Sequence, residues 1–347
     1  MCGITAISAN KEALHFLLQG LEKLEYRGYD SAGITTIENN HLFKKKAKGR
    51  LQNLKDLLKD ENVLGHVGIG HTRWATHGVP SNLNSHPHTN NDETISLVHN
   101  GIIENYRELK EILILQGYKF HSETDSEVVV HLMDYYYKKE KDMLKALQRV
   151  ITRIEGSYAL CIVSLIEPDK VFIAKKDSPL VIGKGENENY ISSDIPAILS
   201  FTRNFYLLND LELVLLTRND VKFFDMDLNP IEKKVEVIEW NATSAEKDGY
   251  EDYMLKEIYE QPTAIRETLG AKLNENAKCD FEELDFTKEY LCGLRKIYLV
   301  ACGTAMHAGL VAKNILEKLC KIPTEVDIAS EFRYRDPIID DKTLCIF

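Results

Sequence analysis

The sequence predicts two domains, an α+β domain with largely antiparallel sheets followed by part of a parallel α/β sheet. A chain of 347 residues exceeds one ordinary core, since domains hold about 150 residues each. Predicted helices give way to a strand-rich middle at residues 157–239, and after about residue 295 single strands alternate with a helix. With 44% hydrophobic and 28% charged residues, the composition is that of a folded globular protein.

The first domain opens with a short apolar strand, Ile4 to Ile7, which a helix follows almost at once. Leucines at helical spacing predict this helix over residues 11–25. Thr124 and Glu127 have the spacing of a capping box, so a helix should start between them. Further helices are predicted over residues 104–116, 125–139 and 142–155, the last of them ended by Gly156.

The strand-rich middle contains short runs of β-branched and aromatic residues separated by turn residues. Such runs are typical of antiparallel sheets rather than of buried parallel strands. The runs are Tyr158–Ile166, Val171–Ala174, Leu180–Gly183, Glu212–Thr217 and Val221–Phe224.

A polar stretch predicts the boundary between the domains. We assign residues 2–240 to the first domain, 241–255 to a linker and 256–347 to the second domain. A long helix with Pro262 near its second turn should follow the linker. The second domain then reads as strand Lys296–Ala301, a glycine-containing turn, a helix over about 306–319 and strand Thr324–Ile328. This order is typical of a parallel α/β sheet.

The final residues, 344–347, read as a buried strand that belongs to a larger sheet. We therefore expect the second domain to be truncated, with Cys345 to Phe347 disordered or misassembled.

Charge and composition exclude several classes of protein. The net charge is -11, with no basic excess to neutralise a nucleic acid. No apolar run approaches the roughly 20 residues of a membrane span, so we expect a cytoplasmic protein that binds neither nucleic acid nor membranes. The seven cysteines never form C-x-x-C, and no histidine spacing is that of a metal site, so thiols should be reduced and no metal is expected.

Cys2 is the first candidate for chemistry. Removal of Met1 would leave a residue with a free amine and a thiol, whose ordinary pKa values near 8 and 8.5 suit a base and a nucleophile. Taken alone, a cysteine at this position is more often an incidental buried residue.

Eight motifs change that interpretation. Together with the initial CGI they resemble glutamine amidotransferases of the N-terminal nucleophile class (class II), and most of all the glutamine:fructose-6-phosphate aminotransferase (isomerising), or glucosamine-6-phosphate synthase, family. The resemblance covers essentially the whole chain. The motifs begin at Tyr26 (YRGYDSAG), His71 (HTRWATHG), His99 (HNGIIEN), Glu123 (ETDSE), Ser192 (SSD), Lys256 (KEIYEQP), Ala301 (ACGT) and Ile328 (IASEFRYR).

The resemblance implies a four-layer α-β-β-α sandwich for residues 2 to about 240, followed by the opening part of a three-layer sugar isomerase domain. It implies that Cys2 attacks glutamine and that Asn100 and Gly101 stabilise the oxyanion, aimed by a tight turn at Asn-Gly. Arg73 and Asp125 would hold the α-carboxylate and α-ammonium of glutamine. The covering loop would include Trp74, Thr76 and His77, and Arg27 would support the thiolate.

For the second domain the resemblance implies a sugar-phosphate contact at Cys302, Gly303 and Thr304. Ala305 stands where the family often has serine, and the catalytic residues of the isomerase are absent. We expect the chain to retain only the glutaminase half of a homodimeric enzyme that makes glucosamine 6-phosphate from fructose 6-phosphate and L-glutamine without a cofactor.

Two alternatives remain open at this point. One is another amidotransferase of the same class, such as amidophosphoribosyltransferase, since CGI and Asn-Gly are widely shared. The other is a noncatalytic sugar-phosphate-binding module, which would not need Cys2, Arg73, Asn100 and Asp125 together.

Overall fold

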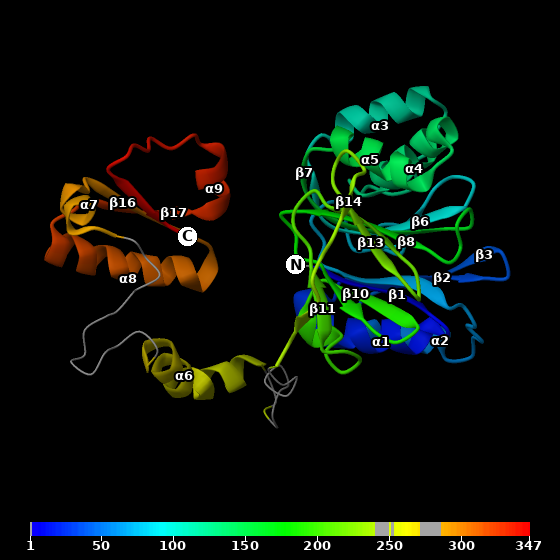
Figure 1. Cartoon of the computed structure of the whole chain (residues 1–347), viewed down its shortest axis with the longest axis horizontal. Helices are drawn as coiled ribbons and strands as arrows, with labels where there is room; N and C mark the ends of the chain where they lie inside the picture. Colours follow the sequence, from blue (N-terminus) through cyan, green and yellow to red (C-terminus); the bar gives the residue numbers. More distant parts are fainter. Residues whose placement is uncertain (1, 240–249, 251–252, 271–285) are drawn as a thin grey trace. The chain divides into compact units, whose positions relative to one another are not determined.

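The chain divides into two compact units, residues 1–248 and 249–347, each of which is described by itself (Figure 1). The computed structural model describes residues 2–239, 250, 253–270 and 286–347. Most of the predicted linker, 241–255, lies outside the described residues, but its last three residues belong to helix α6, Tyr253–Gly270.

Unit 1 is built on two stacked sheets of mostly antiparallel strands. Within the described part of the chain, the first sheet has eight strands in the order β15-β11-β9-β10-β1-β4-β2-β3. The strands are β1 Gly3–Ala9, β2 Ser31–Glu38, β3 His41–Lys48, β4 Val67–Arg73, β9 Val181–Lys184, β10 Glu188–Ser192, β11 Asn204–Leu207 and β15 Glu236–Val237.

The second sheet has seven strands among the described residues, in the order β14-β13-β12-β8-β7-β6-β5. They are β5 His88–Thr89, β6 Ile95–Ile103, β7 Gly156–Ser164, β8 Val171–Lys176, β12 Leu213–Leu216, β13 Val221–Phe224 and β14 Pro230–Ile231.

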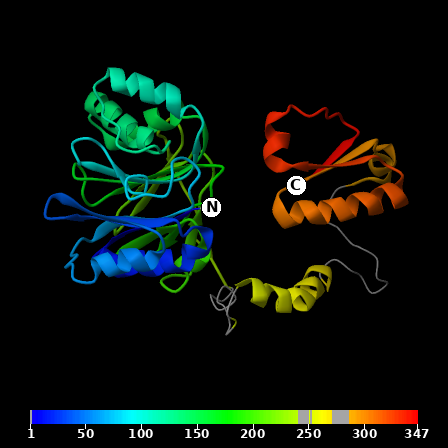
Figure 2. The ribbon, with the colours of Figure 1, turned by 180° about the vertical axis from the view of Figure 1, so that it is seen from behind.

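Helices cover the outer face of each sheet, which completes the four layers that the resemblance implies (Figures 1 and 2). Helices α1, Ala13–Leu24, and α2, Leu51–Leu58, cover the first sheet. The second sheet is covered by α3, Tyr106–Leu115, α4, Glu127–Glu140, and α5, Met143–Arg153. Short 3-10 turns lie at Glu25–Arg27 and Ile195–Ala197.

The layers are held together by three apolar clusters. Ile4, Ile69, Val98 and Ile173 are fully buried between the two sheets. On the outer face of the first sheet, α1 buries residues spaced three or four apart. These residues are Ala13, Phe16, Leu17, Gly20, Leu21 and Leu24. Each fully buried leucine contributes about 1.5–3 kcal/mol, so this periodic face is what fixes α1 on the sheet.

The predicted capping box is wrong. Helix α4 begins after Ser126 without a side-chain cap. The Glu127 carboxylate instead accepts the N–H groups of His121 and Ser122, 2.8 and 2.7 Å away. The Thr124 hydroxyl contacts the ring of His88 in β5, and both Ser122 and Thr124 are buried ahead of the helix.

Unit 2 contains the predicted parallel sheet, with β16, Lys296–Ala301, between β17, Thr324–Ile328, and β18, Thr343–Ile346. The strand predictions for β16 and β17 are confirmed. Helix α8, Gly303–Cys320, begins about three residues earlier than predicted. The remaining helices are α6, in which Pro262 lies in the third turn, α7, Lys288–Gly293, and α9, Ala329–Tyr334.

The expectation for the last residues is corrected in two respects. Cys345 and Ile346 form part of an ordered strand, β18, that pairs in parallel with β16. The strand is not buried, since its first three residues are half-buried and Ile346 is 47% exposed; Phe347, after the strand, is also exposed.

Candidate active site

Cys2 immediately precedes β1 and lies next to the end of the neighbouring strand, β4. Gly3 pairs with Thr72, so the antiparallel register brings Cys2 to Arg73 and Trp74. The Trp74 N–H donates to the Cys2 Sγ at 3.3 Å, and the thiol donates to the Trp74 carbonyl at 3.5 Å. Backbone pairing of β1 with β4, from Gly3 to Ser8, therefore fixes the position of the sulfur.

The surroundings of the thiol have opposing effects on its acidity. Burial raises the pKa of Cys2, while the Trp74 N–H and the positive charge of Arg73 lower it. Burial is the larger effect, and the Asp125 charge adds to it. The neutral thiol is thus favoured at rest, and attack by sulfur needs a base to take its proton.

Asn100 and Gly101 do not form the tight turn that was predicted from Asn-Gly. Both lie inside β6, paired with Ala159 and Tyr158 of β7. Gly101 has φ +128°, and a Cβ there would lie 2.0 Å from the Ser157 carbonyl oxygen. Only glycine fits this backbone, because any side chain would clash with the adjacent strand.

The Asn100 side chain reaches from the second sheet to the start of the first. Its Nδ2 donates to the Cys2 carbonyl at 3.1 Å. The amide has a second N–H, so it can serve as a donor beside the sulfur while it holds the Cys2 backbone.

Arg73 is buried, at 4% exposure, yet part of its guanidinium makes no hydrogen bond within the described part of the chain. The Nη2 group donates to the carbonyls of His77 and Gly78. The Nη1 group is buried without a hydrogen bond among the described residues. A buried donor without a partner is costly, and a carboxylate of a ligand would satisfy it.

Asp125 lies close enough to interact electrostatically with both Cys2 and Arg73. Its Oδ2 accepts the Ile103 N–H at 2.7 Å, which anchors the carboxylate at the end of β6. The site therefore contains a cation and an anion close to a thiol, as an amino acid substrate requires.

The segment that begins at Trp74 is the most exposed part of the site. Trp74 is 44% exposed and packs edge-on against Tyr29, while Thr76 is exposed and the His77 ring contacts Tyr106. With this exposure, Trp74 is not a residue of the hydrophobic core.

Residues of the YRGYDSAG motif contact the backbone of this segment and of the residue before it. Asp30 accepts the Ala75 N–H at 2.8 Å. A Cβ on Gly28 would lie 2.7 Å from the Arg73 carbonyl carbon, so glycine permits the close approach. Asp30 was missed by the sequence analysis, although its motif was recognised.

Arg27 makes its contacts away from the sulfur. Its Nη2 pairs with Asp194 at 2.7 Å, and its Nε donates to the Tyr26 hydroxyl. Support of the thiolate by Arg27 stays a prediction, and its described role is to join the first motif to the Ser192–Asp194 motif.

The residues proposed for sugar phosphate lie in unit 2. Cys302 precedes α8, and Gly303 and Thr304 are its first residues, all three of them exposed. This places backbone N–H groups at the carboxyl edge of β16, where the sequence predicted them, and the phosphate contact stays a prediction.

The histidines cluster more tightly than the sequence indicated. His71, His86, His88 and His99 are all buried, and the rings of His71 and His86 stack at 4.1 Å. The sequence shows only that ten of the eleven histidines lie between His15 and His131. No group of acidic, histidine or cysteine side chains in the described ranges is arranged to hold a metal ion.

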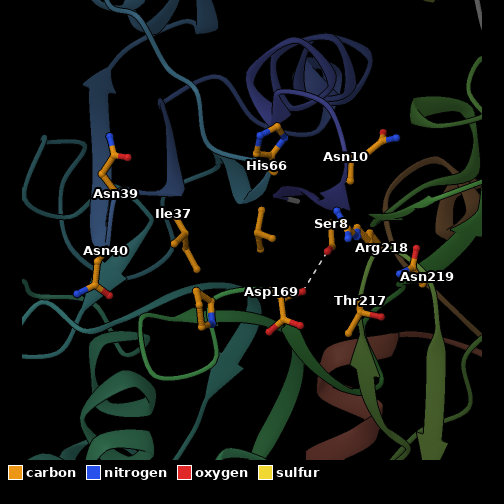
Figure 3. A pocket seen from close by; sticks show the side chains of 13 residues that line it. Ser8, Asn10, Ile37, Asn39, Asn40, His66, Asp169, Thr217, Arg218 and Asn219 are labelled. Atoms are coloured by element: carbon orange, nitrogen blue, oxygen red, sulfur yellow. Dashed lines mark hydrogen bonds between the residues drawn. The ribbon is translucent and has the colours of Figure 1, made fainter.

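A cavity of about 580 Å³ lies at the opposite end of β1 (Figure 3). Ser8 and Asn10 line it, together with Asp169, whose carbonyl accepts the Ser8 hydroxyl, and Arg218. None of the predicted site residues lines this cavity, so it is separate from the Cys2 site.

Comparison with known proteins identifies two domains. A glutamine amidotransferase domain matches residues 71–200, and a SIS domain matches residues 291–347. In unit 1 and the described part of unit 2, no helix has the length and apolar character needed to span a membrane.

Named relatives match over the whole chain. The glutamine–fructose-6-phosphate aminotransferases (isomerizing) of Clostridium perfringens and Methanosarcina acetivorans are 54% and 47% identical to it, over 346 and 356 aligned residues. The matches include 100% of this chain but 56% and 57% of the relatives. The chain thus spans about half the length of the curated relatives it matches.

A solved structure supports the fold. The glutamine phosphoribosylpyrophosphate amidotransferase from B. subtilis matches 94% of this chain and 65% of its own length, with a TM-score of 0.59 at 20% identity. That likeness concerns the fold alone. The sequence matches thus show a glutamine amidotransferase domain and part of a SIS domain, in a chain that is similar over its whole length to glutamine–fructose-6-phosphate aminotransferases (isomerizing).

Proposed function

We propose that unit 1 hydrolyses the side-chain amide of L-glutamine, with Cys2 as the nucleophile. The observation that carries the proposal is the grouping of a half-buried thiol, an asparagine amide and a buried arginine whose Nη1 has no hydrogen bond among the described residues. These are the parts that acyl transfer from an amino acid substrate requires.

Recognition of glutamine rests on the two charges beside the thiol. Arg73 would bind the α-carboxylate through Nη1, and Asp125 would receive the α-ammonium. Trp74, Thr76 and His77 would cover the bound substrate from the exposed segment. Glutamate, the product, keeps both charged groups and so competes for the same contacts.

The reaction begins with attack of the Cys2 sulfur on the amide carbon. With Met1 removed, the free α-amine of Cys2 takes the thiol proton and delivers it to the leaving nitrogen, which departs as ammonia. Asn100 Nδ2 and the Gly101 N–H stabilise the oxyanion of the tetrahedral intermediate. Water then cleaves the γ-glutamyl thioester, which releases glutamate and restores the thiol.

For the whole protein we propose the activity that the relatives' name describes, transfer of the glutamine nitrogen to fructose 6-phosphate. Residues 2–240 would be the glutaminase domain and 256–347 part of the sugar isomerase domain. In the latter, Cys302, Gly303 and Thr304 would contact the sugar phosphate at the start of α8. The whole enzyme would act as a cytoplasmic homodimer without a cofactor.

The test combines intact mass with an activity assay. The purified chain is weighed before and after incubation with 6-diazo-5-oxo-norleucine, a glutamine-like electrophile, and glutamate release is measured in parallel. We expect loss of Met1, a single adduct mapped to Cys2 and glutamate release. Cys2→Ala should abolish both adduct and release.

The matched control is Cys292→Ala, because Cys292 is an exposed cysteine of unit 2. It should leave the adduct and the activity unchanged. Glutamate release at the normal rate by Cys2→Ala would show that the nucleophile has been wrongly assigned.

A further inference from the structure

His71 is a buried residue of β4 whose side chain crosses from the first sheet to the second. It is 1% exposed, and β4 lies between β1 and β2. Its Nε2 lies 3.0 Å from the His99 carbonyl oxygen and 3.0 Å from Asn100 Oδ1. A single ring nitrogen thus contacts both the backbone and the side chain of the strand that carries the proposed oxyanion donor.

The chemistry of these contacts determines the orientation of the Asn100 amide. A carbonyl oxygen can only accept a hydrogen bond, so His71 Nε2 must carry the hydrogen that it donates to His99. The Asn100 atom that faces the same N–H must then be an acceptor, its Oδ1. It follows that Nδ2 faces the other way, toward Cys2, as its 3.1 Å bond to the Cys2 carbonyl requires.

The ring is also held in one protonation state. Burial lowers the pKa of His71 to about 3, so the imidazole stays neutral with one hydrogen. That hydrogen is on Nε2, and Nδ1 is buried without a hydrogen bond among the described residues. The stacked His86 ring fixes the plane of the imidazole from one side.

We propose that His71 is a positioning residue for the glutaminase reaction. Its hydrogen bond prevents rotation of the Asn100 amide and so keeps Nδ2 directed at the oxyanion. The proposal rests on the proposed function of Cys2 and deepens it. Without this lock, the amide could rotate by half a turn and place Oδ1, a partial negative charge, where the oxyanion forms. The donor would then be lost in part of the molecules.

Activity measurements separate positioning from a structural role. Loss of one oxyanion donor lowers kcat by about 100-fold to 1,000-fold. We expect His71→Leu to lower kcat for glutamate release by up to this factor, set by the share of molecules in which the amide has rotated, with little change in KM, because Arg73 and Asp125 still hold the substrate. His71→Gln keeps an N–H at a similar reach and should recover most of the activity.

The decisive comparison is a double-mutant cycle with Asn100→Ala. If His71 acts only through Asn100, His71→Leu has no further effect on kcat once Asn100 is alanine. Ile151→Val, a mild core change in α5, controls for a general loss of packing and should leave kcat unchanged. Equal kcat losses from His71→Leu in both backgrounds would overturn the proposal.

A second readout does not depend on activity. Nitrogen-15 shifts of the imidazole should identify His71 as the tautomer with hydrogen on Nε2, and the Asn100 side-chain amide should give one sharp pair of signals that doubles or broadens in His71→Leu. A hydrogen on Nδ1, or an unchanged Asn100 amide in the variant, would refute the lock. If wild-type protein released no glutamate, the proposed function would be wrong. The NMR signals would still test whether His71 orients the Asn100 amide.

Discussion

Acid should destabilise unit 1 well before its carboxylates are protonated, because four histidines are buried in it. Burial lowers the pKa of His71 to about 3, those of His86 and His88 well below the ordinary value, and that of His99 as well. Lys46 and Arg73 add to the effect at His88, whereas the Glu127 charge opposes it. The Asp125 charge opposes it at His99.

The sign follows from the protons bound in each state. An unfolded histidine has a pKa of about 6.5, so below that pH the unfolded chain binds protons that the folded chain refuses. Stability is therefore complete above pH 6.5 and is lost as the pH falls toward 3. Glu127, whose pKa is held at about 2, stays ionised between pH 7.5 and 5.5.

The magnitude can be worked from the linkage relation. One histidine that stays neutral when folded costs about 1.4 kcal/mol at pH 5.5 relative to pH 7.5. Four such histidines cost about 5.5 kcal/mol as an upper value, which is comparable with the whole stability of a typical domain, about 5–15 kcal/mol.

The assay is urea unfolding at pH 7.5, 6.5 and 5.5, followed by tryptophan fluorescence. Both tryptophans have positions below 249, so the signal reports on unit 1. His86→Leu should remove about a quarter of the pH dependence, whereas Ile151→Val should lower stability equally at each pH. A free energy of unfolding at pH 5.5 within about 1 kcal/mol of that at pH 7.5 would refute the burial argument.

Three substitutions test the site and its backbone. Arg73→Lys should raise KM for glutamine by about tenfold to 100-fold, measured by glutamate release, because lysine cannot both hold the 77–78 carbonyls and bind a carboxylate. An unchanged KM would remove Arg73 from substrate binding. Asp125→Asn keeps an oxygen for the backbone bond but loses the charge, so KM should rise while the thermal midpoint stays near that of wild type. A fall in kcat alone would contradict the ammonium contact. Gly101→Ala should lower the free energy of unfolding by several kcal/mol more than Gly117→Ala, which also has positive φ but open space around it. Equal losses would mean that the clash at Gly101 is relieved by a backbone shift.

Much of the secondary structure could be predicted from local patterns. Strands β13, β16 and β17 have the predicted bounds, because each is a short run of apolar and β-branched residues between turn signals. The strands at residues 31–48 and 67–73 were missed. In them, glycine, lysine and threonine interrupt the apolar alternation. Pairing of β4 with β1, of β2 with β4 and of β3 with β2, rather than local propensity, holds them in the sheet.

The errors share one physical cause, which is that local motifs were read without their tertiary partners. Asn100-Gly101 has the sequence of a hairpin turn, yet pairing with β7 keeps it in a strand. Thr124 and Glu127 have the spacing of a cap, yet both side chains are used by His88 and the 121–122 backbone. In each case contacts between segments distant in sequence outweigh a local preference of about 1 kcal/mol.

The residues of the site could be predicted from the sequence, but the contacts between them could not. Resemblance named Cys2, Arg73, Asn100 and Asp125, which lie far apart in sequence, but their proximity follows from strand order. Because β1 and β4 are neighbours in one sheet and β6 lies in the other, the sulfur and the guanidinium approach along the first sheet while the amide reaches across. The residue that spans this gap from β4 is His71. Its part in the site depends on a contact between sheets, which no pattern within β4 reveals.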